Sequence, residues 1–416
     1  MVSGTQTAYK PSLISWNLTK RCNLRCPHCY MDAGSKAAHE LTTRECLDLL
    51  DEMKAVGTEM VILTGGEPLL RRDIYDIARH ASDLGIWVVM GTNGVLVTER
   101  VATRMVDCGV KGVAISIDSA NPETHDRFRG GPNAWAHSVR ALEISRAHGL
   151  EVLIQTTVMA MNFDEVPGLI AFAREKGAWS FNLYFLVRTG RGHEMNDLSP
   201  ERTAAMLSDL VDAQDEYRPM LVRAKCAPQF KQIAYAKGKP GLESGGCMAG
   251  TQYARITPEG QVTPCPYMTV VAGDVREQSF TEIWRSSPVL RELRDIEALK
   301  GRCGRCEFKA LCGGCRCRAY AAFGDYLQED PACTYQPTGR PLEQPVLVWS
   351  AEAQARLDRI PIAFVREKVR QGLEAYAHRN GIDRITPDVM KEGLSGDGRP
   401  RAFEKLPAFL KPGQPN

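Results

Sequence analysis

Three cysteines within eight residues constrain this chain more than any other feature. They form the pattern Cys22-x3-Cys26-x2-Cys29, directly after an apolar run, Leu13–Trp16, that is typical of a strand. Three thiolates on one short loop favour an iron–sulfur cluster, because thiolate is a soft ligand. The usual set has four ligands, so one iron would stay open to a small molecule if no protein group completes it.

A zinc site is the alternative interpretation of this loop, with His28 as a possible fourth ligand. His28 stands between two of the thiols, where the short loop favours another direction for its ring. The spacing and the context therefore favour the iron–sulfur cluster.

The remaining cysteines also indicate metal binding. The chain has 416 residues and 14 cysteines. Nine of them fall in its second half: Cys226, Cys247, Cys265, Cys303, Cys306, Cys312, Cys315, Cys317 and Cys333. Cys46 and Cys108 stand apart in helical patterns, where we expect them to be small buried hydrophobic side chains. Clusters of this kind are typical of metal ligands rather than of disulfides.

Charge and hydropathy exclude several partners. Lys and Arg number 52 against 50 Asp and Glu, a balance that gives no reason to expect nucleic acid or an anionic membrane. No apolar run approaches the roughly 20 residues that cross a bilayer, and Met1–Lys10 has no apolar signal segment. We expect a cytoplasmic protein, in a compartment that keeps thiols reduced.

The first half of the chain predicts an α/β fold, because short β-branched runs alternate with helical patterns. The expected strands are Leu13–Asn17, Met60–Thr64, Ile86–Thr92, Gly112–Ile117, Glu151–Val158 and Ser180–Phe185, and the expected helices are Thr42–Val56, Ile74–Leu84, Glu99–Cys108, Asn133–Ala147 and Phe163–Lys176. Such alternation implies parallel strands with right-handed crossovers. Six strands fit a partial (βα)6 barrel, a TIM-like barrel left open, and a doubly wound sheet is the alternative.

The second half predicts smaller units. The pattern over Leu198–Gln232 predicts a connecting helix, and Glu259-Gly260 is expected to form the turn of a small hairpin. A Cys-rich module over Gly301–Cys333 would depend on metal for its stability. The predicted domains are a barrel at 1–197, an iron–sulfur domain at 198–334, a linker at 335–348, a small helical domain at 349–394 and a loose tail at 395–416. We expect C-terminal helices over Ala351–Ile360 and Ile362–Asn380, and a third starting near Thr386.

Two motifs together resemble the radical S-adenosylmethionine (SAM) superfamily. They are Cys22-x3-Cys26-x2-Cys29, followed by Tyr30, and Gly65-Gly66-Glu67-Pro68 after the second predicted strand. The resemblance implies that the cysteines hold a [4Fe–4S] cluster whose open iron chelates the methionine part of SAM. It also implies that the backbone of Gly65, Gly66, Glu67 and Pro68 lies against the methionine ammonium, and that reduction of SAM yields a 5′-deoxyadenosyl radical.

The resemblance suggests further SAM contacts at the ends of later strands. Asn93, Ser116 and Asp118 occupy positions where polar side chains of the family contact the cofactor. From the residues alone, Asn93 also suits a turn, and Asp118 also suits a helix N-cap. Arg127 and Arg129 could reach a carboxylate of SAM or of a substrate, or could belong to a solvated face.

The second group of cysteines resembles the SPASM extension of radical SAM enzymes, which carries one or two auxiliary [4Fe–4S] clusters. The resemblance places Cys303, Cys306, Cys312 and Cys333 on the cluster farther from the active site, and Cys247, Cys265 and Cys315 on the nearer one. The last pair is spaced x2 rather than x3, and Cys226 and Cys317 are further candidates. Whether the nearer cluster has an open iron is left undecided, and a pair of zinc knuckles is the alternative.

A finer resemblance points to the branch of the superfamily that modifies haem side chains, in alternative haem synthesis and nitrite-reductase haem synthesis. It is carried by phrases such as Pro264-Cys265-Pro266-Tyr267 and Cys312-Gly313-Gly314-Cys315-Arg316. The run Ile360–Arg366 is similar to the C-terminal domain of light-independent protochlorophyllide reductase, with a three-helix docking module as the alternative.

These resemblances imply an enzyme that trims or decarboxylates propionates of a tetrapyrrole, supplied with electrons by a flavodoxin or ferredoxin. A SPASM maturase acting on a ribosomal peptide is the alternative within the same chemistry. A zinc-binding scaffold protein is the alternative that is not an enzyme.

Overall fold

The computed structural model describes residues 9–35, 37–195, 198–239, 246–342, 347–360, 363–379 and 382–395. Its main sheet has the strand order β10-β9-β8-β1-β2-β3-β4-β5-β6-β7. The strands are β1 Leu13–Asn17, β2 Met60–Thr64, β3 Trp87–Thr92, β4 Gly112–Ser116, β5 Glu151–Val158, β6 Ser180–Phe185, β7 Leu221–Lys225, β8 Tyr253–Ile256, β9 Gln261–Thr263 and β10 Gly273–Asp274. From β8 through β1 to β7, neighbouring strands pair in parallel.

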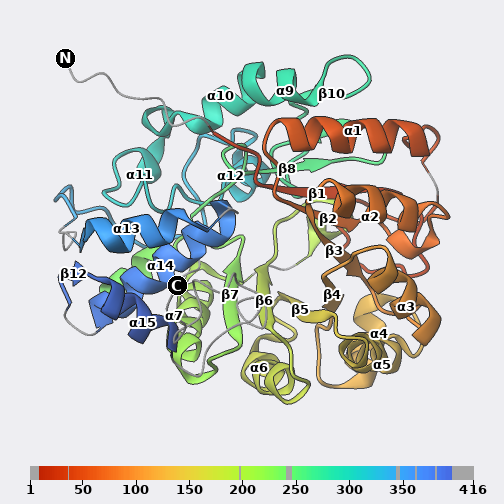
Figure 1. The fold of residues 1–416 in the computed structure, drawn as a ribbon, viewed down its shortest axis with the longest axis horizontal. Coiled ribbons are helices and arrows are strands. Elements are labelled where there is room, and N and C mark those ends of the chain that lie inside the picture. The colour runs from red at the N-terminus through yellow and green to blue at the C-terminus, as the bar shows by residue number, and fades with distance from the viewer. Residues whose placement is uncertain are drawn as a thin grey trace.

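The sheet forms an open barrel. In Figure 1, β1 to β7 follow one another along an arc, with α1 to α6 on its outer side. The helices of this half are α1 Thr43–Ala55, α2 Ile74–Asp83, α3 Glu99–Asp107, α4 Pro122–Arg129, α5 Ala134–Ala147, α6 Val166–Glu175, α7 Pro200–Glu216 and α8 Phe230–Ala236. The predicted α/β class with a partial barrel is confirmed.

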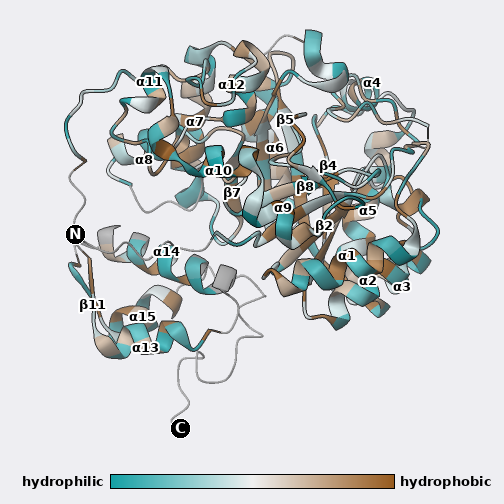
Figure 2. Ribbon diagram, turned by 90° about the horizontal axis from the view of Figure 1, so that it is seen from above, coloured by the Kyte–Doolittle hydropathy of each residue, from teal (hydrophilic) through white to brown (hydrophobic). Residues whose placement is uncertain are grey.

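Local sequence explains where these elements begin and what they bury. Thr42 and Glu45 form the expected capping box of α1, each binding the other's backbone N–H. Trp16 and Phe181 on the sheet and Leu50 on α1 are fully buried in one continuous core. Figure 2 shows the same division, with hydrophobic residues along the strands and hydrophilic ones on the outer sides of the helices. Burial of these apolar faces, at about 25 cal/mol per Å², fixes the helices on the sheet.

Two parts of the predicted topology are wrong. The connecting helix expected over Leu198–Gln232 is two helices, α7 and α8, with the additional parallel strand β7 between them. Helix α4 was also not expected, and it precedes α5. Strand β7 was missed because its run, Leu221–Lys225, has only five residues, and a run of that length gives a weak periodic signal inside a longer stretch expected to be one helix.

The second half adds the predicted hairpin to the sheet and a compact cysteine-rich module. Strands β8 and β9 are antiparallel around Glu259-Gly260, and β8 joins the sheet beside β1. Helices α9 Phe280–Ser286 and α10 Pro288–Arg294 precede the module, and the module contains α11 Gly301–Gly304 and α12 Arg316–Phe323. Buried charges join its parts, because Arg318 binds Asp330 at 3.2 Å.

The C-terminal region folds as three helices on its own small core. They are α13 Ala351–Asp358, α14 Ala363–Arg379 and α15 Pro387–Ser395, joined by a parallel pair, β11 Val348–Trp349 and β12 Arg384–Ile385. Leu357, Leu373 and Ile385 are buried among them. The three predicted helices are confirmed, and the strand pair was not expected. The predicted tail lies, apart from Ser395, outside the described residues.

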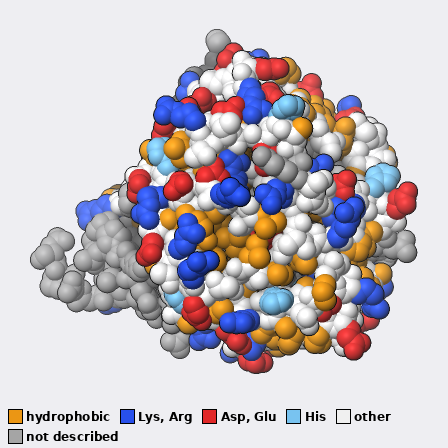
Figure 3. Space-filling model, turned by 90° about the vertical axis from the view of Figure 1, so that its right-hand side faces the viewer, with side chains coloured by type: hydrophobic (Ala, Val, Ile, Leu, Met, Phe, Trp, Pro, Cys, Tyr) orange, Lys and Arg blue, Asp and Glu red, His pale blue; other side chains and the backbone are white. Residues whose placement is uncertain are grey.

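The described surface carries charges of both signs. Figure 3 shows the face at the right of Figure 1, where hydrophobic side chains gather in a patch bordered by Lys and Arg. None of the described helices is both long and apolar enough to cross a lipid bilayer.

Candidate functional site: two groups of cysteines on one cavity

The three cysteines of the first motif lie on the loop after β1, and their side chains face one cavity. Burial, together with the charges of Glu67, Cys26 and Cys29, raises the pKa of the Cys22 thiol to about 11. The loop is closed on itself, because the Cys22 N–H donates to Gly34 O at 3.0 Å and the Cys29 N–H donates to Cys26 O at 3.3 Å. The three cysteines therefore lie on one closed loop that lines the cavity.

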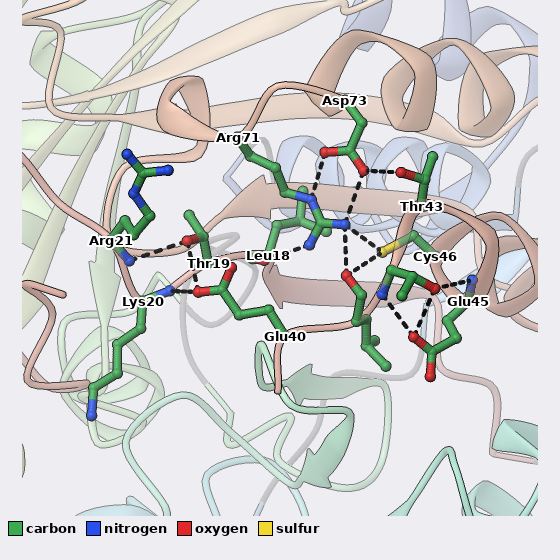
Figure 4. Close-up of polar contacts among 12 residues, drawn as sticks. Leu18, Thr19, Lys20, Arg21, Glu40, Thr43, Glu45, Cys46, Arg71 and Asp73 are labelled. Carbon is green, nitrogen blue, oxygen red and sulfur yellow. Dashed lines mark hydrogen bonds and ion pairs between the residues drawn. The ribbon is translucent and has the colours of Figure 1, made fainter. Parts of the chain in front are cut away.

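Two charged side chains hold the segment that leads into this loop (Figure 4). The Arg71 guanidinium donates to Leu18 O at 2.8 Å, to Leu41 O at 2.7 Å and to the Cys46 sulfur at 3.4 Å. Asp73 orients it through an ion pair at 2.8 Å. Cys46 is fully buried, which confirms its predicted place in the core.

Glu40 holds the next residues of the same segment. Its carboxylate accepts from the Thr19 hydroxyl at 2.8 Å and from the Lys20 N–H at 2.9 Å (Figure 4). Hydrogen bonds to a charged group contribute about 1.5–3 kcal/mol each. Sequence patterns did not reveal Glu40 or Arg71, because both act on backbone carbonyls and amides far along the chain.

Gly65 and Gly66 pack directly against that segment. The Gly66 N–H donates to Thr19 O and the Glu67 N–H donates to Arg21 O, both at 2.7 Å. A Cβ at Gly66 would stand 2.2 Å from Arg21 O, and one at Gly65 would stand 2.5 Å from Thr19 O. Only glycine allows this approach. Both glycines line the cavity, beside the cysteines.

Glu67 lies behind the cavity wall. Its carboxylate is fully buried and accepts from the Thr92 hydroxyl, the Asn93 N–H and the Leu69 N–H, at 2.9 to 3.2 Å. Burial raises its pKa to about 7, although these hydrogen bonds oppose the rise. Glu67 thus ties the turn after β2 to the end of β3. Its contact with a cofactor stays a prediction, as does that of Pro68, the first residue of a short 3-10 turn, Pro68–Leu70.

Asn93 reaches the cysteine loop. Its amide donates to Asn23 Oδ1 at 2.8 Å and lies 3.9 Å from the Cys22 sulfur. Asn93 and Ser116 line the cavity, where they were expected.

Asp118 and Arg129 form a buried ion pair beside Cys26. Asp118 also accepts from the Thr157 N–H at 2.7 Å, whereas Asn121 is the N-cap of α4. Asp118 is therefore not the N-cap that the residues also allowed. Arg129 lines the cavity and approaches the Cys26 sulfur at 4.0 Å, so it is not part of a solvated face. Arg127 is exposed at the end of the same helix.

His28 stacks its ring on Phe128, with ring centroids 4.1 Å apart. Burial, followed by the charge of Arg129, lowers its pKa well below the usual range. Its Nδ1 atom and the Nε of Arg129 are buried without a hydrogen-bond partner among the described residues. Both side chains line the cavity.

Arg191 clamps the cysteine loop from the other side. Its guanidinium donates to Cys26 O at 2.9 Å and to Ala33 O at 2.7 Å, and pairs with Asp32. Gly190 beside it has φ +56°, and a Cβ there would stand 2.4 Å from Cys29 O. This arginine, in the segment after β6, therefore holds the cysteine loop in place.

The cavity has a volume of about 1660 Å³ and extends from the first motif to the second half of the chain. Its wall there includes Cys226, Cys247, Cys265, Cys315 and Cys317. These cysteines form one buried cluster with Met268 and Val187. A hydrogen bond with Cys317 lowers the pKa of Cys315 to about 7. Cys317 also forms a hydrogen bond with the Cys265 thiol. The structure thus brings both additional candidates, Cys226 and Cys317, to the nearer group.

Cys226 has an unusual backbone. Its φ is +59°, a region that residues other than glycine adopt rarely. The Arg318 guanidinium donates to Cys226 O at 2.8 Å and so holds this conformation. Such outliers persist where the surroundings fix them, often at functional sites.

The farther group has a small cavity of its own, of about 30 Å³. Its wall includes Cys303, Cys306, Cys312 and Cys333, the four cysteines that the SPASM resemblance put together. Backbone N–H groups of Asp330 and Gly314 point at the sulfurs of Cys303 and Cys312, each at 3.5 Å. Such hydrogen bonds stabilise thiolates that bind a cluster.

The donor sets fit iron–sulfur clusters. Cysteines gather in groups of three, five and four along the two cavities, and burial raises the pKa of Cys22, Cys226 and Cys312 above the usual value. Across the described ranges, no group of three or more Cys, His, Asp or Glu side chains is arranged to hold a single metal ion.

Three family models match consecutive parts of the chain. The radical SAM superfamily matches residues 16–173, and an iron–sulfur cluster-binding domain, SPASM, matches 247–315. The proto-chlorophyllide reductase 57 kD subunit matches 349–392.

Similar proteins cover most of the chain. An AdoMet-dependent heme synthase of Methanosarcina barkeri is 42% identical over 340 residues, which are 79% of this chain and 97% of that protein. A pre-heme d1 synthase of Dinoroseobacter shibae is 34% identical over 78% of this chain and 86% of that protein. The structure of Streptococcus suis SuiB bound to S-adenosylmethionine has a TM-score of 0.66 at 15% identity, over 79% of this chain and 78% of that one. That likeness shows the fold.

Proposed function

This chain belongs to the radical SAM family, and we propose that it decarboxylates or trims propionate side chains of a tetrapyrrole. As a radical SAM enzyme, it uses [4Fe–4S] clusters and SAM. The heme synthase and the pre-heme d1 synthase support this proposal, because both are named for haem-type products.

The observation that carries the proposal is the size and charge of the cavity. Its volume of about 1660 Å³ exceeds the roughly 300–1,000 Å³ of common small-ligand sites, so it has room for SAM and a macrocycle. Twelve Lys and Arg residues contribute to its wall, against four acidic residues, all glutamates. A wall with an excess of basic residues attracts a negatively charged substrate. A flat molecule with several carboxylates suits this chemistry.

We assign the cluster that binds SAM to Cys22, Cys26 and Cys29, which face the cavity together. When bound, this cluster supplies the electron that cleaves SAM to methionine and a 5′-deoxyadenosyl radical. The chain's own residues bind, orient and shield the reactants. Arg129 and His28 offer buried nitrogen atoms to the cofactor, and the Gly65-Gly66 turn lets the backbone approach it.

We assign the nearer auxiliary cluster to Cys247, Cys265 and Cys315, with Cys226 as its fourth ligand. The strained backbone of Cys226 and its place beside these three support this assignment. Cys303, Cys306, Cys312 and Cys333 would hold the farther cluster. Iron counts separate the candidates: Cys226→Ala should lose iron from one cluster, whereas Cys317→Ala should keep it.

The partners that follow are a tetrapyrrole and an electron donor such as a flavodoxin or ferredoxin, in the cytoplasm. The C-terminal helices contribute to the substrate site, because α14 and α15 supply part of the cavity wall, including Arg366 and Arg370. That wall favours a binding role for this region over a remote docking module.

The test is incubation of the reconstituted protein with SAM, a reductant and candidate substrates, followed by mass spectrometry. We expect an iron-coproporphyrin to lose the mass of carboxyl groups as 5′-deoxyadenosine forms. If 5′-deoxyadenosine forms while every porphyrin keeps its mass, the tetrapyrrole proposal fails and a ribosomal peptide becomes the substrate to test. Reconstitution with zinc but no iron or sulfide would instead support the scaffold alternative.

A further inference from the structure

Tyr30 stands at a particular point of the cavity wall, between the two groups of cysteines. It follows Cys29 directly, and it lines the same cavity as Cys29 and Cys265. Its ring lies 5.1 Å from that of Tyr267, at an interplanar angle of 58°. Tyr30 and Tyr267 line the cavity, as do Tyr184 and Tyr253. A substrate that contacts both cysteine groups would pass this wall of tyrosines.

A buried chain of hydrogen bonds fixes how Tyr30 can bond. Arg255 donates from Nε to Asn17 Oδ1 at 2.5 Å, and Asn17 donates from Nδ2 to the Tyr30 oxygen at 2.8 Å. Asn17 is fully buried and Arg255 is 8% exposed. A guanidinium has only donors, so the side of the Asn17 amide that faces Arg255 must be its oxygen. The assignment of the amide therefore follows from chemistry.

This direction leaves the Tyr30 proton available. The Tyr30 oxygen already accepts from Asn17, so its O–H has to donate elsewhere. Within the described ranges, no acceptor for this O–H is present. Tyr30 lines the cavity, but Asn17 and Arg255 are not among the described residues that do so. The chain thus runs from a buried arginine to the hydroxyl of a residue that lines the cavity. A group held in this way is a preorganised hydrogen-bond donor.

We propose that Tyr30 donates a hydrogen bond to a carboxylate of the substrate and so places that side chain between the cysteine groups. The proposal rests on the proposed function, because it takes the ligand to be a propionate. An ionised carboxylate only accepts hydrogen bonds, and its bonds to hydroxyl donors are short and strong. Tyr30 is then a positioning residue that contacts the reacting side chain.

Two variants test the direction of the chain as well as its end. Tyr30→Phe keeps the ring and removes the donor. Asn17→Asp leaves Tyr30 in place, but its carboxylate accepts from Arg255 and also from the Tyr30 hydroxyl, which turns that proton away from the cavity. A purely structural role for Tyr30 predicts little effect on binding from Asn17→Asp. Tyr75→Phe, on α2 beneath Arg104, is the matched control.

The readout is binding of iron-coproporphyrin and of its tetramethyl ester, followed by absorbance under anaerobic conditions, with iron content measured for each variant. We expect Tyr30→Phe and Asn17→Asp to weaken binding of the acid about tenfold, to weaken binding of the ester less, because its carbonyl accepts a weaker hydrogen bond, and to keep the iron content of the wild type. Tyr75→Phe should bind both like the wild type.

The proposal is overturned if either Tyr30→Phe or Asn17→Asp, with normal iron content, binds the acid like the wild type. It is also overturned if the acid and the ester weaken equally. If the wild type binds no tetrapyrrole at all, the proposed function itself fails, and the inference about a propionate fails with it. The wild-type arm therefore separates the two failures.

Discussion

The cysteine loop after β1 and the cysteine group around Cys226 differ in how the fold brings their thiols together. The first places three thiols within eight residues and fixes them by backbone contacts and by clamps such as Arg71 and Arg191. The second gathers thiols from segments up to about 90 residues apart and relies on buried side chains. The difference suggests that the first site is shaped before any cluster binds, whereas the second depends more on its cluster.

The largest expected effect separates the two sites by function. Cys22→Ala removes a thiol of the SAM-binding site, so 5′-deoxyadenosine formation should fall to the background rate. Cys303→Ala removes a thiol of the farther group, so SAM cleavage should stay measurable in this variant. The iron content should drop in both variants. Chromatography of 5′-deoxyadenosine, alongside iron analysis, checks this. Equal loss of SAM cleavage in both would contradict a separation of roles.

Arg71→Met tests whether the first loop is fixed by its clamp. The change leaves the carbonyls of Leu18 and Leu41 and the carboxylate of Asp73 without their partner in a largely buried place. We expect a loss of about 3–5 kcal/mol in the free energy of unfolding. Urea denaturation of the reconstituted protein measures it. Arg44→Met, which breaks an exposed pair with Asp48, should cost less than about 1 kcal/mol.

Gly66→Ala tests the contact between the glycine turn and the same loop. Its Cβ would stand 2.2 Å from Arg21 O, so the two backbone segments must separate. A loss of about 2–4 kcal/mol is expected, together with weaker binding of SAM. Gly168→Ala is the control, since a Cβ there meets nothing within 4 Å in helix α6. It should be neutral or stabilise by up to about 1 kcal/mol, and a similar cost for both changes would refute the contact.

Glu67 gives the first region a pH dependence. Its pKa is about 7 in the fold against a usual 4.5, so the folded state binds a proton that the unfolded state releases. Stability from this group is complete below about pH 4.5 and is lost as the pH rises through 7. The loss is about 3 kcal/mol. Urea midpoints of Glu67→Gln should show a smaller fall than the wild type between these pH values, and parallel curves would contradict the shift.

The barrel was predictable because its signals are local. Alternating strands and helices, the Thr42 capping box and the C-terminal helices can each be read within a few residues. Strand β7 escaped prediction because Leu221–Lys225 is held by its pairing with β6, which the sequence does not encode locally.

The candidate site was predictable to the same extent. The motif cysteines, Asn93 and Arg129 were recognised as candidates, because spacing and strand ends point to them, and all of them line one cavity. Arg71, Glu40 and the chain that ends at Tyr30 were not, since their partners are backbone groups or side chains more than ten positions away. Long-range polar contacts leave no periodic pattern.

The most direct test of the account follows hydrogen from the substrate. Iron-coproporphyrin with deuterium on its propionate side chains is incubated with the reconstituted protein, SAM and a reductant. The mass of the 5′-deoxyadenosine that forms is then measured by mass spectrometry. The account predicts deuterium in the 5′-deoxyadenosine together with loss of carboxyl mass from the porphyrin. Unlabelled 5′-deoxyadenosine beside an intact porphyrin would contradict it.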